Sequence, residues 1–256
     1  MWYSLTFLCG HGLRLASRAG QSGRLHRVPP VTAEEALAEL EALSDPERAE
    51  GMAAYHKAPR RYLGIAVPDI DRLAKGWRTE ASVAERAELA DGLWATDIHE
   101  ARVAAAKLLT QARLKPDDTP VWDVICGWVP TFDAWAVADH ACAAGARRLV
   151  ADPSRLDTVE NWTRSDHLWT KRAALVMTLP WTKQNHPKPE ELAARDRVLG
   201  WAASYVEDRQ WFIQKAIAWW LRELSKHDPQ RTRAFLDRHG EAMKPFARRE
   251  AGKYLT

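Results

Sequence analysis

The sequence has few of the residues that cross-link a chain or break its secondary structure. Its 256 residues include three cysteines, 13 glycines and 14 prolines. Cys9, Cys126 and Cys142 form no Cys-x-x-Cys pair and leave one cysteine unmatched. This pattern argues against a disulfide framework and a structural zinc site, and favours a reducing, cytoplasmic compartment. With 46% hydrophobic residues and frequent Ala, Leu, Arg and Glu, the composition excludes a disordered chain and favours helices.

Long apolar runs and several common catalytic motifs are also missing. The opening MWYSLTFLC is too short to span a membrane and carries no basic residue, so we expect neither a membrane anchor nor a signal peptide. The sequence contains no Gly-x-Gly-x-x-Gly, P-loop, His-Glu-x-x-His or zinc-deaminase pattern. We therefore predict no cofactor and no catalytic metal.

Charge is distributed unevenly along the chain. Residues 1–33 contain four arginines and no acid. Residues 34–163 contain 15 Lys and Arg against 23 Asp and Glu, a net charge of −8, whereas residues 164–256 contain 18 against 11, a net charge of +7. A basic C-terminal half suits contact with a polyanion, although a solvated charged surface would give the same pattern.

The amino-terminal segment differs from the remainder of the chain. Its basic, acid-free stretch with Ser and Gly is typical of an unstructured arm, weakly resembles a transit peptide, and would also arise from a start codon assigned too far upstream. The Pro29-Pro30 pair marks its boundary. We therefore expect a flexible basic arm over residues 1–30 and a single domain over residues 31–256.

Two kinds of capping sequence mark helix starts after this arm. In a capping box, a side-chain oxygen and a carboxylate three residues later bind the first free backbone N–H groups. We expect such boxes at Thr32 with Glu35, Ser82 with Glu85, and Asp97 with Glu100. An aspartate cap followed by proline is expected at Asp45-Pro46, Asp152-Pro153 and Asp228-Pro229.

The number and spacing of these starts predict the fold class. About a dozen short helices joined by tight loops, with no run of alternating β-branched residues, indicate an all-α protein. Antiparallel helix pairs stacked into a HEAT-like superhelix, or solenoid, with a concave basic face fit this pattern, although the period is imperfect. A globular all-α domain is the alternative.

Aromatic and charged residues at helical spacing suggest where chemistry takes place. Trp135 and Asp139 are four residues apart, so they share one face of a helix and can border the same concavity. An acid beside an indole is unusual on a helix otherwise rich in Ala and Val. The alternative is a solvent-exposed aspartate and a half-buried core tryptophan.

A second segment, RQWFIQKAIAWWLRELSK, predicts a helix with two distinct sides. One side forms an aromatic and cationic stripe: Trp211, Lys215, Trp219 and Arg222. The other side can pack on neighbouring helices through Ile213, Ile217 and Trp220. The stripe suits contact with deoxyribose and phosphate. Alternatively, both indoles belong to the core and both cations reach solvent from its edge.

Further cations lie in the basic half of the chain. Trp169 and Arg172 are three residues apart and therefore share a face, with Lys171 adjacent. Other candidates for contact with a polyanion are Lys183, Arg248 and Arg249. Each of these would also be normal on a solvated surface.

Taken together, residues 34–256 resemble the AlkD-like family of bacterial DNA alkylation repair proteins, which are DNA glycosylases built from HEAT-like repeats. The resemblance rests on five segments: MAAYHKAPRRYLGIAVPDIDRLAK, WAVADH, RSDHLWTKRAAL, WFIQKAIAWWLRELSKHDP and FARREAGKYL. The fourth segment is the most specific. The resemblance supports the superhelical fold over the globular alternative.

The resemblance also implies an activity and roles for individual residues. It implies removal of N3- and N7-alkylated purines from double-stranded DNA, without a metal or cofactor and without base flipping, by a cytoplasmic monomer that associates with the nucleoid when acting. Asp139 would be the catalytic carboxylate, Trp135 and Trp219 would flank the deoxyribose of the lesion, and Arg172 would hold a phosphate beside it. Arg172 is also the candidate for the cation that Asp139 would need beside it in a phosphate-rich cleft. Tyr55 and Phe212 match aromatic positions that line the duplex.

Three departures from the family pattern bear on the substrate range. Ala66 replaces a polar glutamine that members can carry, and Ala134 and Ala136 flank the first tryptophan where an aromatic residue and an acid can occur. The stretch between Arg172 and Trp219 is also longer than usual. Two rival interpretations are a non-catalytic helical module that binds damaged or distorted DNA and a solenoid that binds only proteins.

Overall fold

The computed structural model describes residues 30–79 and 81–255, and this part of the chain folds into α-helices and short 3₁₀ helices without a strand. The predicted arm over residues 1–30 lies almost entirely outside the described residues. The α-helices are α1 (Ala33–Glu41), α2 (Pro46–His56), α3 (Val67–Arg78), α4 (Val83–Ala95), α5 (His99–Leu109), α6 (Thr119–Trp128), α7 (Trp135–Ala151), α8 (Leu156–Trp162), α9 (Leu168–Val176), α10 (Pro189–Ser204), α11 (Trp211–Ser225), α12 (Pro229–His239) and α13 (Pro245–Ala251), with η1 (Val129–Thr131), η2 (Pro153–Arg155) and η3 (Leu179–Thr182) between them.

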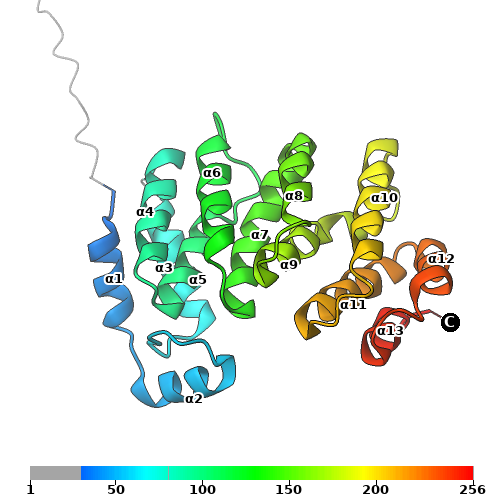
Figure 1. The fold of residues 1–256 in the computed structure, drawn as a ribbon. Coiled ribbons are helices and arrows are strands. Elements are labelled where there is room, and N and C mark those ends of the chain that lie inside the picture. Colours follow the sequence, from blue (N-terminus) through cyan, green and yellow to red (C-terminus); the bar gives the residue numbers. More distant parts are fainter. Residues whose placement is uncertain (1–29, 80, 256) are drawn as a thin grey trace, which may run out of the picture.

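The helices form an elongated array that follows the chain from α1 at one end to α12 and α13 at the other (Figure 1). Helices α3, α5, α7, α9, α11 and α13 form one row, in which each helix packs on the next. Helices α1, α4 and α6 pack in succession along a second row, and α10 packs on α12 at the far end of the molecule. The expected all-helical repeat architecture is confirmed.

Polar contacts between successive units show a regular period that the sequence does not display. Side-chain hydrogen bonds join residues 37 positions apart at several points: Trp128 with Asp91, Arg155 with Asp118, Arg197 with Glu160, and Lys171 with Asp208. The residue types differ at each contact, so the repeat is visible in three dimensions and not as a repeated motif.

Most of the predicted helix caps are present. Thr32 and Ser82 form complete capping boxes at the starts of α1 and α4. Asp45 and Asp228 cap α2 and α12, each followed by proline at the first helical position. Asp152 also accepts a backbone hydrogen bond, but the helix it begins is the short η2. These caps divide the chain into short helices, as the sequence predicts.

The predicted capping box at Asp97 and Glu100 is wrong. Asp97 has a positive φ of 55°, and α5 begins at His99 after the cap residue Ile98. The Glu100 carboxylate is fully buried and accepts hydrogen bonds of 2.8 Å from the backbone N–H groups of Leu63 and Gly64. A buried carboxylate is strongly favoured to bind donors, so the long-range contact replaces the local one.

Many of the tryptophans stabilise the core. Those with at most 7% of their surface exposed are Trp77, Trp94, Trp122, Trp128, Trp181, Trp201 and Trp220. On α11, the side predicted to pack is fully buried, at Ile213, Ile217 and Trp220. The opposite side of α11 and parts of α7 and α9 remain accessible, and there the candidate site lies. No helix in the described residues is long and apolar enough to cross a membrane.

Candidate functional site

Four adjoining cavities run along the accessible sides of α7, α9, α11 and α13. The α11/α13 cleft has a volume of about 620 Å³, and the aromatic cleft, between α2, α7, α9 and α11, has a volume of about 600 Å³. The imidazole chamber, between α2, α3, α5 and α7, has a volume of about 330 Å³. The α7/η3 cleft has a volume of about 530 Å³. Trp135 borders the aromatic cleft and the chamber, Asp139 borders the chamber and the α7/η3 cleft, and Trp219 borders the α7/η3 and α11/α13 clefts. The three residues therefore lie where neighbouring cavities meet.

Asp139 is held by Arg172 across the contact between α7 and α9. The Nη1 atom of Arg172 donates to Oδ1 of Asp139, and Nη2 donates to Oδ2 at 3.2 Å. The arginine side chain is 4% exposed, whereas the aspartate side chain is 24% exposed. This bidentate pair fixes the carboxylate and leaves it as the partner nearer to solvent.

The burial of Arg172 bears on its expected role. Its guanidinium also lies 5.7 Å from the ring centroid of Trp169, and its Nε atom is buried without a hydrogen-bond partner among the described residues. This arrangement suits a cation that stabilises the charged carboxylate of Asp139. The phosphate contact that the family resemblance implies stays a prediction.

Trp135 begins α7 and is half-buried against the end of α2. The centroid of its ring lies 5.9 Å from that of Tyr55, in an edge-to-face arrangement, and 5.2 Å from that of His56. Two residues earlier, the carboxylate of Asp133 binds the side chain of Arg60, which is fully buried. This ion pair ties the start of α7 to the loop after α2, so the position of Trp135 relative to Tyr55 is set by both segments.

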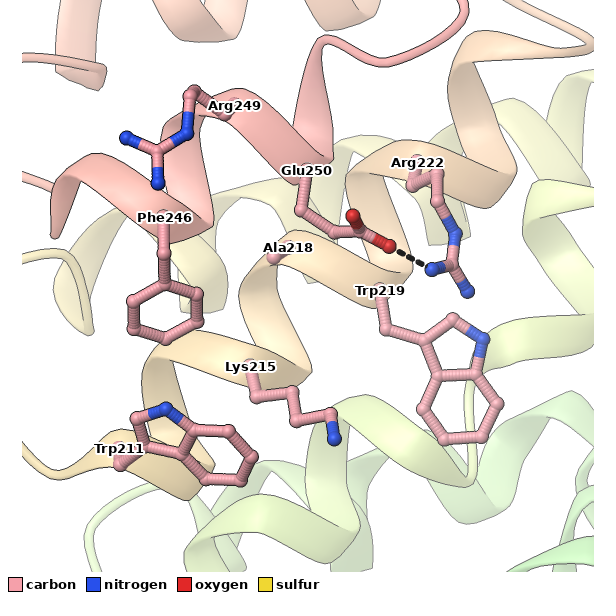
Figure 2. Close-up of a pocket in the computed structure, with 8 residues that line it drawn as sticks. All are labelled: Trp211, Lys215, Ala218, Trp219, Arg222, Phe246, Arg249 and Glu250. Carbon is pink, nitrogen blue, oxygen red and sulfur yellow. Dashed lines mark hydrogen bonds and ion pairs between the residues drawn. The ribbon is translucent and has the colours of Figure 1, made fainter.

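The stripe on α11 lines the α11/α13 cleft as the helical spacing predicts. Figure 2 shows the side chain of Lys215 reaching into the space between Trp211 and Trp219. The Nζ atom of Lys215 is 4.5 Å from the ring centroid of Trp211, a cation–π contact that keeps both groups at the surface. Arg222 binds Glu250 of α13 (Figure 2), so its charge is partly neutralised.

The other candidate cations occupy different settings. Lys171 binds Asp208 at 2.6 Å, and both side chains are mostly buried. Lys183 borders the α7/η3 cleft with Asp139, and Arg249 borders the α11/α13 cleft. Arg248 is exposed, and its Nη1 atom lies 3.6 Å from Oε1 of Glu241. Lys183 and Arg249 are therefore the best placed of these four to meet an anion in the cavities.

An aromatic row joins the clefts. The ring centroid of Phe212 lies 4.7 Å from that of Trp169 and 4.9 Å from that of Trp211. The ring centroids of Trp211 and Phe246 are 5.9 Å apart. The 69% exposed side chain of Tyr55 faces the same aromatic cleft from α2. Tyr55 and Phe212, the two aromatic residues that the resemblance places along the duplex, therefore border the same cavity.

Several residues of the site were not singled out from the sequence. Arg147 lies two turns after Asp139 on the same face of α7 and borders the α7/η3 cleft. Its spacing could have revealed it. His56, Phe246 and Glu250 carry no such signal, because their place depends on the packing of separate helices. Across residues 30–79 and 81–255, no group of three or more His, Cys, Asp or Glu side chains could hold a metal ion.

Comparison with known proteins supports the architecture. The family model described as "DNA alkylation repair enzyme" matches residues 36–255. No curated protein matches the chain. Among solved structures, a protein described as a predicted DNA alkylation repair enzyme from Enterococcus faecalis aligns with a TM-score of 0.70 and 23% identity, over 83% of this chain and 97% of its own.

Two structures from Streptococcus mutans are similar at lower TM-scores. The protein called smu.31, from strain UA159, gives a TM-score of 0.52 at 17% identity, over 88% of this chain and 99% of its own. The protein called AlkD2 gives a TM-score of 0.52 at 18% identity, over 87% of this chain and 99% of its own. At these identities the likeness concerns the fold.

Proposed function

The chain belongs to the family of DNA alkylation repair enzymes, and from this premise we propose that it hydrolyses the N-glycosidic bond of N3- and N7-alkylated purines in duplex DNA. It acts as a cytoplasmic monomer, without a metal and without flipping the base. The observation that supports this proposal is the convergence of Trp135, Asp139 and Trp219 on adjoining cavities, with Asp139 held by Arg172.

The chemistry of the lesion explains why these residue types suffice. An alkyl group on N3 or N7 gives the purine a positive charge, so the glycosidic bond is weak and the base leaves as a neutral molecule. The positive charge then moves to the sugar, which becomes an oxocarbenium-like cation in the transition state. A fixed carboxylate at Asp139 and the electron-rich faces of Trp135 and Trp219 stabilise that charge as it develops.

The exposure of the three side chains supports attack on a nucleotide that stays in the helix. Trp135, Asp139 and Trp219 are each partly exposed at the borders of cavities. Side chains placed in this way can meet a deoxyribose at the surface of the duplex. An enzyme that flips its target base holds that base in a closely fitting pocket instead.

Incubation of the protein with N7-methylated duplex DNA, followed by chromatographic identification of the free base, tests the proposed function. We expect release of N7-methylguanine and formation of an abasic site, at a rate well above that of the duplex alone. Binding of the duplex without any release would contradict the proposal and favour a non-catalytic DNA-binding module. Absence of binding would favour a protein-interaction solenoid.

Replacement of Lys215 by Ala should weaken DNA binding equally for all sequences. Among residues 30–79 and 81–255 no acid forms an ion pair with its ammonium, which lies between two exposed clefts and can neutralise one phosphate. The salt dependence of binding, as log Kd against log salt concentration, should therefore lose about one unit of slope. Lys171→Ala is the matched control, because Lys171 is already neutralised by Asp208. Equal losses of slope in both variants would contradict this assignment.

Replacement of Glu250 by Gln should strengthen DNA binding. Glu250 is the acid that borders the α11/α13 cleft, and it holds Arg222. Removing its charge frees one cation and removes a repulsion, so affinity should rise about three- to tenfold at low salt, with a steeper salt dependence. Glu241→Gln changes the same charge on a 90% exposed residue outside the cleft and should have a smaller effect. Fluorescence anisotropy of labelled duplex at several salt concentrations measures both changes.

A further inference from the structure

Trp219 lies between two cavities that both contain cations. It borders the α11/α13 cleft, together with Lys215 and Arg249. It also borders the α7/η3 cleft, together with Arg147 and Lys183. Within the part of the chain that the structure describes, no acid forms an ion pair with any of these four cations. The proposed function has assigned no role to the cations of the α7/η3 cleft.

Arg147 is accessible, whereas its neighbour in the sequence is not. Arg148 is fully buried, and it binds Asp118 at 2.8 Å and backbone carbonyls of the segment before α6. Arg147 is exposed and follows Asp139 on α7 by about 12 Å along the helix axis. Helical side chains lean toward the N-terminus of their helix, so the surface that Arg147 covers lies on the Asp139 side of its own Cα.

The other residues of the α7/η3 cleft suit a sugar-phosphate backbone. Its walls consist largely of small or apolar side chains: Ala143, Ala146, Val150, Val176, Leu179 and Pro180. Asp139 is the acid among the described residues that line the cleft, and it is already paired with Arg172. The cleft therefore combines apolar walls for a deoxyribose with a net positive charge for a phosphate.

The covalent structure of DNA connects the two clefts. Each deoxyribose inside a strand lies between two phosphodiester groups, one on its 5′ oxygen and one on its 3′ oxygen. A deoxyribose in contact with Trp219 therefore has a phosphate on either side. Because Trp219 borders both clefts and both contain cations, each of these phosphates can meet a positive charge.

We propose that Arg147 and Lys183 bind the backbone of the lesion-bearing strand on one side of Trp219, whereas Lys215 and Arg249 bind it on the other side. This inference rests on the proposed glycosylase function, which places the deoxyribose of the lesion against Trp219. The two contacts hold the strand at both ends of the reacting nucleotide and so fix the sugar in the site.

The inference changes the residues that make the phosphate contact implied by the family resemblance. That contact was expected of Arg172. The guanidinium of Arg172 is almost fully buried, and both of its terminal nitrogens donate to Asp139. Arg147 and Lys183 are exposed on the cleft that Asp139 borders, so they can reach a phosphate without leaving the carboxylate unpaired.

The test combines protein variants with duplexes in which one phosphate is neutral. A methylphosphonate, in which methyl replaces a non-bridging oxygen, removes one negative charge from the DNA. Each duplex contains one N7-methylguanine and one methylphosphonate, placed at one of about the first three phosphates on either side of the lesion. About 12 Å of α7 covers this range at roughly 3.4 Å per nucleotide. The rate of base release is measured under single-turnover conditions, at protein concentrations below Kd.

On duplex without methylphosphonate, the double variant Arg147→Gln/Lys183→Gln should release base about tenfold more slowly, because two charge-assisted contacts are lost. This loss should shrink to less than about twofold when the methylphosphonate occupies the contacted position. The loss caused by Lys215→Ala should shrink at a position on the opposite side of the lesion. A variant that is merely misfolded would show the same loss on every duplex.

Arg113→Gln/Lys75→Gln is the matched control. Both residues are exposed and border none of the four cavities, and their replacement removes the same charge. We expect a loss of less than about twofold that is equal on all duplexes. If the double variant at Arg147 and Lys183 does not fold, each single variant should lose about threefold and respond to the same methylphosphonate position.

Two results would overturn the inference: losses for Arg147 and Lys183 that are equal on every duplex, and losses that depend on the same side of the lesion as those of Lys215. Either result, obtained while the unmodified protein releases base, leaves the proposed function intact. Failure of the unmodified protein to release any base would refute the proposed function, and this inference with it.

Discussion

Asp139→Asn should reduce release of N7-methylguanine from duplex DNA on the order of 10³-fold while changing duplex affinity less than about threefold. Asparagine has nearly the same shape and can still accept a hydrogen bond from Arg172. It lacks the negative charge that stabilises the sugar cation in the transition state. Single-turnover kinetics with protein in excess separate this loss from any change in binding, which anisotropy measures independently.

Asp123→Asn is a suitable control for that experiment. Asp123 is exposed on α6, away from the residues that border the four cavities. Its replacement changes the net charge by the same amount and should leave the rate unchanged. An Asp139→Asn variant that releases base at the rate of the unmodified protein would show that the carboxylate does not stabilise the transition state.

Arg172→Met should reduce release roughly 100-fold and also lower the free energy of unfolding by about 3 kcal/mol. The arginine side chain is 4% exposed and donates twice to Asp139. Without it, the carboxylate loses its partner and its fixed position in a partly buried site. Urea unfolding followed by circular dichroism measures the stability, and the single-turnover assay measures the activity.

Arg172→Lys separates charge from geometry at the same position. Lysine keeps the positive charge but cannot bind both carboxylate oxygens in one plane. We expect it to recover most of the stability and only part of the activity. Full activity in Arg172→Met would contradict the role of the arginine in holding Asp139, and would also argue against the phosphate contact that the resemblance implies.

The sequence predicts local features well because their causes are local. Thr32 and Ser82 begin helices, since the partner carboxylate of each capping box lies only three residues away. The capping box predicted at Asp97 does not form. Its predicted partner Glu100 binds backbone groups 36 and 37 residues earlier in the chain, and no local pattern reveals a contact of that kind.

The candidate site divides in the same way. The spacing of Trp135 and Asp139 places both on one face of α7, and the structure brings that face to the cavities. The spacing says nothing of Arg172, because the pair with Asp139 depends on how α9 packs on α7. The neutralisation of Arg222 by Glu250 likewise depends on α13. Of the two cations that the sequence predicts on the stripe, Arg222 is therefore paired, whereas Lys215 has no ion-pair partner within the part of the chain that the structure describes.

The central claim is that the site stabilises a sugar cation whose base leaves without acid catalysis. It is tested most directly by comparing release of two bases from otherwise identical duplexes under single-turnover conditions: cationic N7-methylguanine and neutral hypoxanthine. The account predicts release of the first and none of the second, because no group in the site is proposed to protonate a neutral leaving base. Release of hypoxanthine at a comparable rate would contradict it.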